Sequence, residues 1–347
     1  MTGSAGAYAV RAMETAGDLG EFGLIERLLA RIGESGEGVV VGPGDDAAAV
    51  AIGPARGLAT ADLLLEGVHF EIGLSSPADV GWKALAANLS DIAAMGGTPR
   101  YALVSLGAPA ATPTATLEEV YGGLAECAQA FSVVVVGGDT VRADRLIVSV
   151  AVLGEPGPAG IVTRAGAQPG DVVCVTGTVG GAAAGLALLR AARNDAVAGA
   201  LLERYPELAK AHRRPTPRVR EGLAAATAAA AAMIDVSDGL AADVSHIGER
   251  STVGVALRTA PLPAGLDDVA AWLSRDAVEF GVAGGDDYEL AIAIAPDRVD
   301  ALAAALGPTT VTVVGEIVEG RQRVLQREDG TTTDLAKLGW DHFEEST

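Results

Sequence analysis

The sequence predicts a two-domain protein of the α+β or α/β class, with an N-terminal mixed sheet that carries helices on one face and a C-terminal α/β domain. The chain has 347 residues, more than one average domain needs, and 49% of them are apolar. Short apolar segments alternate with segments whose apolar residues recur at helical spacing. A Pro- and Gly-rich stretch at 154–160 is typical of a linker, so we expect domains at 19–155 and 160–345 after a frayed stretch at 1–18.

The N-terminal half is expected to be rich in strands, with helices covering one face of the sheet. Pro77 can open a helix because its missing N–H is not needed in the first turn, and the glycines after Met95 can end it. Leu85, Leu89 and Ile92 share one face of that helix with Trp82. The expected elements are helices at 21–31, 77–95 and 117–131, and strands at 38–42, 47–53, 57–61, 101–107, 133–136 (a buried strand) and 146–153.

The C-terminal half alternates strands and helices. A glycine-rich loop at 176–181 lies between a strand and a helix, where a helix N-terminus could cradle a phosphate. The loop lacks the Lys-Ser/Thr pair of a P-loop, so a structural turn is the favoured interpretation. The expected elements are strands at 171–175, 233–236, 288–294 and 310–317, and helices at 182–193, 218–232, 240–250 and 296–306.

Aspartates recur at the ends of apolar segments. The clearest case is the segment 39–50, in which two apolar runs flank a Gly-Pro-Gly turn followed by Asp45 and Asp46. A single such turn is more often a solvated acidic turn, but the pattern returns at Asp62, Asp91, Asp139, Asp235, Asp238 and Asp286. An oxygen-rich set with few histidines and no paired cysteines favours Mg²⁺ over zinc. Several aspartates with Mg²⁺ and no evident covalent nucleophile fit phosphoryl transfer.

Composition excludes several classes of partner. The formal net charge is −20, which argues against nucleic acid and against an anionic membrane surface. A phosphate ligand would meet like charge, unless metal ions on the carboxylates invert the local potential. No apolar run is long enough for a transmembrane helix, and residues 1–18 lack the pattern of a signal peptide. Cys127 and Cys174 indicate buried thiols in a reducing compartment, so the expected location is the cytoplasm.

A few basic and aromatic residues have two interpretations each. Arg164 could meet a nucleotide phosphate or form a surface salt bridge. His69 beside Phe70 is more often structural than a ligand contact. His212 lies in a basic patch that fits a solvated helix end better than a phosphate-facing loop. Trp340 is either part of a core or a plate on which a cationic heterocycle can stack.

Ten sequence blocks, in one order from Gly20 to Phe343, resemble the thiamine-monophosphate kinase family. They are GEFGLIERL, GPGDDAA, TADLLLEGVHF, KALAANLSDIAAMG, GGDT, TRAGAQPGD, VTGTVGGAAAGL, IDVSDGLAADVSHI, GGDDYEL and LGWDHF. The wider superfamily contains aminoimidazole ribonucleotide synthetase, selenophosphate synthetase and a hydrogenase-maturation enzyme. The blocks GVHF, IDVSDG and GGDDYEL indicate the thiamine branch.

The resemblance implies phosphorylation of thiamine monophosphate to thiamine diphosphate by ATP and several Mg²⁺ ions, directly and without a phospho-enzyme. It also implies a homodimer in which the N-terminal sheets join in a barrel-like interface. Matched by position, the metal ligands would be Asp46, Thr60, Ala61 (through its carbonyl), Asp62, Asp91, Asp139, Asp235 and Asp238. The nucleotide contacts would be Gly138, Asp139, Arg164 and Ser237, and the substrate contacts His69, Asp286 and Trp340.

Two positions depart from the family pattern, and two other functions stay open. Ala61 stands where the family often has a hydroxyl residue, and Asp286 where it often has Glu, which is one methylene longer. The first alternative is a related ATP-dependent synthetase or cyclase of the same superfamily, which a substrate panel would reveal. The second is a non-catalytic acidic metal-binding module, which would bind Mg²⁺ or Ca²⁺ without nucleotide.

Overall fold

The computed structural model describes residues 23, 25, 38–42, 44–52, 55–327 and 329–339. Apart from the first two, all of these lie in one compact unit, Gly36–Trp340. The frayed stretch expected at 1–18, most of the helix expected at 21–31, and Trp340 fall outside the described residues. Within the part that is described, no helix is long and apolar enough to cross a membrane.

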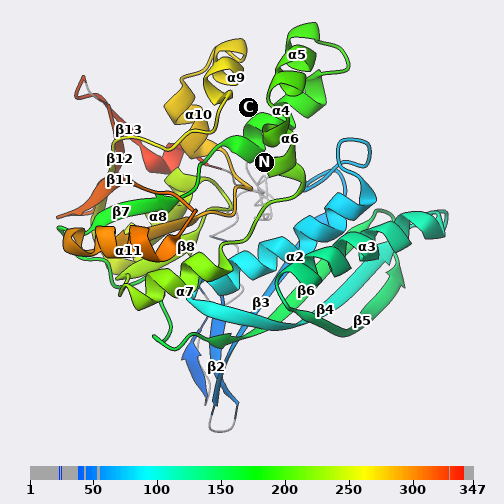
Figure 1. Ribbon diagram of the computed structural model, residues 1–347, viewed down its shortest axis with the longest axis horizontal. Coiled ribbons are helices and arrows are strands. Elements are labelled where there is room, and N and C mark those ends of the chain that lie inside the picture. The colour runs from blue at the N-terminus through cyan, green and yellow to red at the C-terminus, as the bar shows by residue number, and fades with distance from the viewer. Residues whose placement is uncertain are drawn as a thin grey trace, which may run out of the picture. The chain divides into compact units, whose positions relative to one another are not determined.

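The N-terminal half forms a mixed six-stranded sheet. All neighbouring strands are antiparallel except β4 and β5, which run parallel. The strands lie in the order β1 (Val39–Val41), β2 (Ala48–Ile52), β3 (Ala55–Leu65), β6 (Ile147–Pro156), β4 (Gly97–Ala108) and β5 (Val134–Arg142). Helices α2 (Pro77–Ala94) and α3 (Thr114–Ala130) lie side by side, and α2 contacts β3, β6 and β4 (Figure 1). This agrees with the expected mixed sheet with helices on one face.

Alternation along the strands gives this sheet one covered face and one open face. In β4, Ala102, Val104 and Leu106 are buried beneath the helices. Tyr101 and Leu103, which alternate with them, are 50% and 43% exposed. In-register neighbours share a face, so Leu63 of β3, Val134 of β5 and Leu153 of β6 join these two residues. We call this exposed side, lined by Leu63, Tyr101, Leu103, Val134 and Leu153, the free face.

The prediction of a buried strand at 133–136 is wrong. Val134, Val135 and Val136 are all exposed, and β5 continues through the two following glycines to Arg142. The apolar run was interpreted as a core strand because a strand buried on both faces and an exposed edge strand with apolar side chains have the same composition.

The C-terminal half forms a seven-stranded sheet with helices on both faces. Its strands lie in the order β13 (Thr332–Asp334), β12 (Arg323–Gln326), β9 (Gly254–Leu257), β11 (Val311–Val318), β7 (Val172–Thr176), β10 (Leu290–Ile294) and β8 (Ala232–Asp235). The helices are α4 (Gly181–Ala191), α5 (Ala196–Arg204), α6 (Pro206–Arg213), α7 (Val219–Thr227), α8 (Leu240–Ser251), α9 (Leu266–Trp272), α10 (Ala277–Ala283) and α11 (Val299–Leu306), with 3₁₀ turns at Pro296–Arg298 and Leu335–Lys337. Helix α8 packs on one face of the sheet, and α7 and α11 on the other.

Helix α2 connects the two halves. It begins with a capping box in which Ser76 and Asp79 exchange hydrogen bonds, and Pro77 occupies its first position. Its last turn, Ala93 and Ala94, joins the apolar cluster between α7 and the C-terminal sheet. Its packing against α3 is close, because a Cβ at Gly81 would lie 1.8 Å from the carbonyl oxygen of Val120. Side chains on α2 are therefore held firmly between the two sheets.

Candidate active site

Three aspartates from distant parts of the sequence meet at one point. Asp46 comes from the turn between β1 and β2, Asp91 from α2, and Asp235 from the end of β8. One carboxylate oxygen of each lies within 4.8 Å of the other two. We call these three, together with Asp62, the acid cluster. The geometry is suited to a cation, because one ion can lie within reach of all three oxygens.

Strand β3 contributes Thr60 and Asp62 to the same place. Both are in register with residues of β6 that are buried beneath the helices, so their side chains point to the helix side of the sheet. The Thr60 hydroxyl donates a hydrogen bond of 2.5 Å to Asp91 Oδ2. The backbone N–H of Asp62 donates to Asn88 Oδ1 of α2 at 3.1 Å, which fixes the strand against the helix.

The acid cluster carries negative charge that the protein only partly compensates. Burial, and then the charge of Asp46, raises the pKa of Asp62 to about 6. The pKa of Asp91 is raised well above its usual range by burial and then by Asp62 and Asp235. The buried oxygens Asp46 Oδ2 and Asp235 Oδ2 have no hydrogen-bond donor among the described residues. Carboxylates in this condition fit a hard divalent cation such as Mg²⁺.

Arg164 is the cation that lies closest to this site, and it fixes the acidic turn. Its Nη2 contacts Asp46 Oδ1 at 2.7 Å, and its backbone N–H lies 3.1 and 3.2 Å from the two carboxylate oxygens of Asp45. The Asp46 side chain is fully buried and that of Arg164 is 20% exposed, so the surface salt bridge that the sequence allowed is excluded. Burial, and then the charge of Asp46, raises the pKa of Asp45 to about 6, although the Arg164 N–H opposes the shift.

Asp139, Gly138 and Ala61 are not part of the acid cluster in this structure. Asp139 is in register with Ser105 of β4, whose side chain lies on the free face. Ala61 also points to the free face, because it alternates with Thr60 and Asp62. The missing hydroxyl at Ala61 is therefore lost on the side of the sheet away from the acid cluster. Gly138 lies beside Val104 on the neighbouring strand.

Ser237 and Asp238 follow Asp235 directly, and a further acid meets them. The backbone N–H of Ser237 donates to Asp243 Oδ2 at 3.1 Å. Burial, and then the charges of Asp238 and Asp235, raises the pKa of Asp243 well above its usual range. Asp243 was not expected in the site, although it lies one helical turn into α8, where a side chain can reach back to the strand end.

The predicted substrate contacts His69 and Asp286 are joined by Lys83 of α2. Lys83 Nζ lies 2.7 Å from Asp286 Oδ2 and 3.4 Å from the backbone oxygen of His69. Asp286 Oδ1 accepts a second hydrogen bond, of 3.1 Å, from the Tyr288 hydroxyl. The pKa of Asp286 is lowered in spite of burial, because Lys83 stabilises the charged form. Sequence reasoning missed Lys83 and Tyr288.

His212 corrects a second expectation. It was expected at a solvated helix end, but it is 2% exposed and lies at the buried end of α6. Burial and the nearby Lys83 charge lower the pKa of His212 to about 3, so the ring is neutral at neutral pH. The sequence did not reveal that His212 is buried, because its neighbours Arg213 and Arg214 are charged and favour a solvated helix end.

The glycine-rich loop before α4 is a structural turn, as favoured from the sequence. The carboxylate of Asp287 accepts hydrogen bonds from the backbone N–H groups of Gly180 and Ala182. Two N–H groups at the start of α4 are therefore bound to a carboxylate of the same chain and not directed at a ligand.

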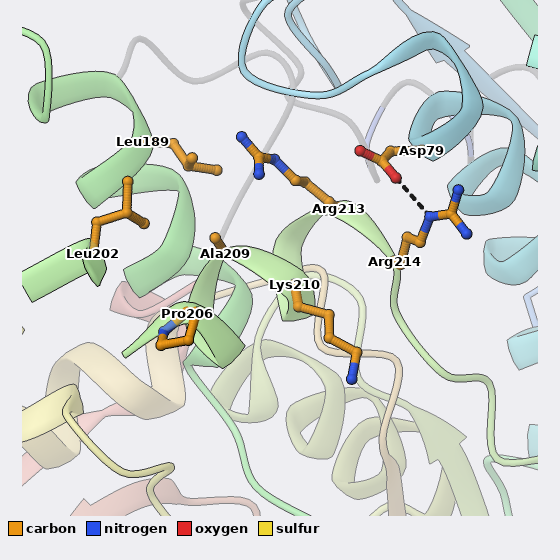
Figure 2. Close-up of a pocket in the computed structure, with 8 residues that line it drawn as sticks. All are labelled: Asp79, Leu189, Leu202, Pro206, Ala209, Lys210, Arg213 and Arg214. Carbon is orange, nitrogen blue, oxygen red and sulfur yellow. Dashed lines mark hydrogen bonds and ion pairs between the residues drawn. The ribbon is translucent and has the colours of Figure 1, made fainter. Parts of the chain in front are cut away.

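A pocket of about 350 Å³ lies apart from these residues, where α4, α5 and α6 meet the first turn of α2 (Figure 2). The Arg214 guanidinium on its wall pairs with Asp79 at 2.6 Å, and Arg213 donates to the backbone oxygen of Leu74. None of the predicted site residues lines it. Its lining is Asp79, Leu189, Leu202, Pro206, Ala209, Lys210, Arg213 and Arg214.

Comparison with known proteins agrees on one family. Residues 44–155 match the model of the AIR synthase related protein, N-terminal domain, and residues 168–327 match that of its C-terminal domain. Thiamine-monophosphate kinase of Bacillus subtilis is 37% identical over 93% of this chain and 99% of its own length, and that of Mycobacterium tuberculosis is 37% identical over 94% and 92%. A solved structure described as AaThiL complexed with AMPPCP and TMP superposes with a TM-score of 0.82, at 31% identity, over 96% of this chain and all of that one.

Proposed function

Because this chain belongs to the family of thiamine-monophosphate kinases, within the AIR synthase related proteins, we propose that its acid cluster is where ATP phosphorylates thiamine monophosphate to thiamine diphosphate. The activity itself, ATP-dependent phosphorylation of thiamine monophosphate, is the one for which its relatives are named. The observation that carries the assignment to this site is the meeting of Asp46, Asp91 and Asp235 within 4.8 Å.

Magnesium is the cofactor that this site supports best. The ligands on offer are carboxylate oxygens, two of them without a hydrogen-bond donor among the described residues. Bound Mg²⁺ would supply positive charge between these carboxylates and the phosphates of both substrates. Asp46, Asp62, Asp91 and Asp235 would hold the first ions, and Asp238 lies close enough along the chain to hold another. The inward placement of Thr60, which hydrogen-bonds Asp91, suits a role in orienting that carboxylate.

The residues around the acid cluster can then orient the two substrates for direct transfer. Arg164 pairs with Asp46 of the cluster and carries a positive charge that can meet a nucleotide phosphate, and Ser237 lies two positions after Asp235. His69 and Asp286 mark the thiamine side. Little proton transfer is asked of the protein, because the second pKa of a phosphate monoester is about 6 and the accepting oxygen is already ionised at neutral pH. Positioning and charge neutralisation are therefore the main contributions of the chain.

We also infer a homodimer joined through the free face. Its five apolar side chains are each at least 42% exposed in a single chain, which is unusual for a monomer. A second copy packed against this face would bury these side chains, and the two sheets would together form a barrel-like interface. It would also cover Ala61 and Asp139, which lie on the same face, and so bring a partner close to two residues expected to contact ATP and its metal ions. The two cysteines, buried and unpaired, support a reducing, cytoplasmic location.

The function is tested by incubating the purified chain with ATP, Mg²⁺ and thiamine monophosphate and separating the products by chromatography. Thiamine diphosphate should accumulate with one ADP for each molecule formed. A panel of other phosphate-bearing substrates, including a formyl-amidine ribonucleotide, serves as the control. Consumption of ATP with the ribonucleotide and not with thiamine monophosphate would favour the synthetase alternative, and metal binding without ATP affinity would favour a binding module.

The dimer is tested by light scattering on the variant Leu103→Arg, which places a charge at the centre of the free face. We expect the wild type to have the mass of two chains and the variant that of one. Val197→Arg is the matched control, because Val197 of α5 is 57% exposed but lies in the C-terminal half. A wild type that elutes with the mass of one chain would overturn the dimer.

A further inference from the structure

We propose that Lys83 is a positioning residue for the thiamine side of the site: it holds the Asp286 carboxylate and the His69 backbone in the arrangement that binds thiamine monophosphate. The inference rests on the proposed function and adds a residue to it. Lys83 opens the block KALAANLSDIAAMG but has no role assigned from the sequence, and it lies 203 positions from Asp286, in the other half of the fold.

The first support is burial. The Lys83 side chain is only 4% exposed, and a lysine is rarely buried so deeply unless its charge is used. Its Nζ meets Asp286 Oδ2 at 2.7 Å, and the backbone oxygen of His69 is its other acceptor. Among the described residues, no other cation lies within ion-pair distance of Asp286.

The second support is the shape of the contact. The Asp286 side chain is short, so its carboxylate can be placed in few ways. Lys83 fixes one oxygen and the Tyr288 hydroxyl reaches the other. The backbone of Asp286 has a φ of +68°, a conformation that side-chain-bearing residues seldom adopt, and the hydrogen bond from its N–H to Ser237 O holds it there. The carboxylate is thus oriented before any ligand arrives, which lowers the entropy lost on binding.

The third support is the position of Lys83 on α2. Lys83 and Asp91 are eight positions apart on α2, so they lie about 12 Å apart along the helix axis and about 80° apart around it. The thiamine side and the acid cluster are therefore built on one rigid element. A residue that orients the thiamine side from this helix also sets its distance from the phosphoryl transfer.

Kinetics of Lys83→Met test the proposal. Loss of a charge-assisted contact should raise the KM for thiamine monophosphate by about tenfold or more, while the KM for ATP stays within about twofold of the wild type. The control is Arg214→Met, which removes another ion pair between α2 and the C-terminal half, that with Asp79, and should leave both KM values within about twofold. If Lys83→Met does not fold, Lys83→Gln carries the same test, because its amide keeps a donor without the charge.

A double variant separates positioning from general structural support. If Lys83 acts through Asp286, adding Lys83→Met to Asp286→Asn should raise the KM no further, within about twofold, than Asp286→Asn alone. Effects that multiply, or an ATP KM that rises as much as the substrate KM, would overturn the proposal. A wild type that makes no thiamine diphosphate would instead defeat the proposed function, so the two failures are distinguishable.

Discussion

Helix α2 meets aspartates in two opposite electrostatic situations, one at Asp91 and the other at Lys83. At Asp91 the helix meets Asp46, Asp62 and Asp235, and burial together with like charge raises the pKa of Asp91 well above its usual range. At Lys83 it meets Asp286, whose side chain is 34% exposed, and the ammonium group lowers the pKa of that carboxylate. The Lys83 end is complete within the chain, whereas the acid cluster has more negative charge than the chain neutralises. We infer that the acid cluster, unlike the Lys83–Asp286 pair, is completed by metal ions.

The largest expected effect is on turnover. Asp91→Asn and Asp62→Asn should each lower kcat by at least about 100-fold at saturating Mg²⁺, because they remove carboxylates that would hold the ions whose positive charge neutralises the transferred phosphoryl group. The exposed Asp297→Asn is the control and should retain wild-type activity. Steady-state kinetics with all substrates in excess measure this. Near-normal turnover in both variants would contradict the inference that the acid cluster, unlike the Lys83–Asp286 pair, binds metal ions.

A smaller effect is expected on thermal stability in the presence of metal. Mg²⁺ should raise the unfolding midpoint of the wild type by several degrees, because it binds the folded acid cluster and not the unfolded chain. Asp91→Asn should lose most of this rise, and Asp286→Asn should keep it. Scanning fluorimetry with Mg²⁺ and with EDTA gives the comparison. An equal rise in all three proteins would mean that the ions bind elsewhere.

The smallest effect is on the pH dependence of the metal-free protein. The pKa of Asp62 is about 6 in the folded chain and 3.8 as its ordinary value, so the folded state holds an extra proton between these limits. Asp62 therefore costs stability above about pH 6, and this cost disappears as the pH falls toward 4. The pKa of Asp286 is lowered, so its contribution is complete above its ordinary value of 3.8 and is lost only below it.

Urea unfolding in EDTA at pH 5 to 8 measures this difference. Asp62→Asn should be more stable than the wild type at pH 8, and the gap should shrink toward pH 5. For Asp286→Asn the difference from the wild type should stay constant across the same range. If the difference in unfolding free energy between Asp62→Asn and the wild type does not change with pH, the charge of the acid cluster is already neutralised in the metal-free chain.

The sequence predicted what depends on local pattern and missed what depends on pairing across the chain. Helix α2 was expected at 77–95 because its cap, its opening proline and its apolar face are all local signals, and it spans Pro77–Ala94. The pairing of Arg164 with Asp46 and of Lys83 with Asp286 joins positions more than 100 apart, and no local pattern records such a pair. The face of the sheet on which Asp139 lies could not be predicted either, because it depends on the register of β5 against β4, which shifts between Ala102 and Leu103 of β4.

The capping box fixes where α2 begins, and the close contact at Gly81 fixes how the helix packs against α3. One residue inserted or deleted between Lys83 and Asp91 would turn one end by about 100° against the other and shift it by about 1.5 Å. We therefore expect the surrounding loops to tolerate changes of length, whereas the number of residues between Lys83 and Asp91 must stay fixed in an active enzyme.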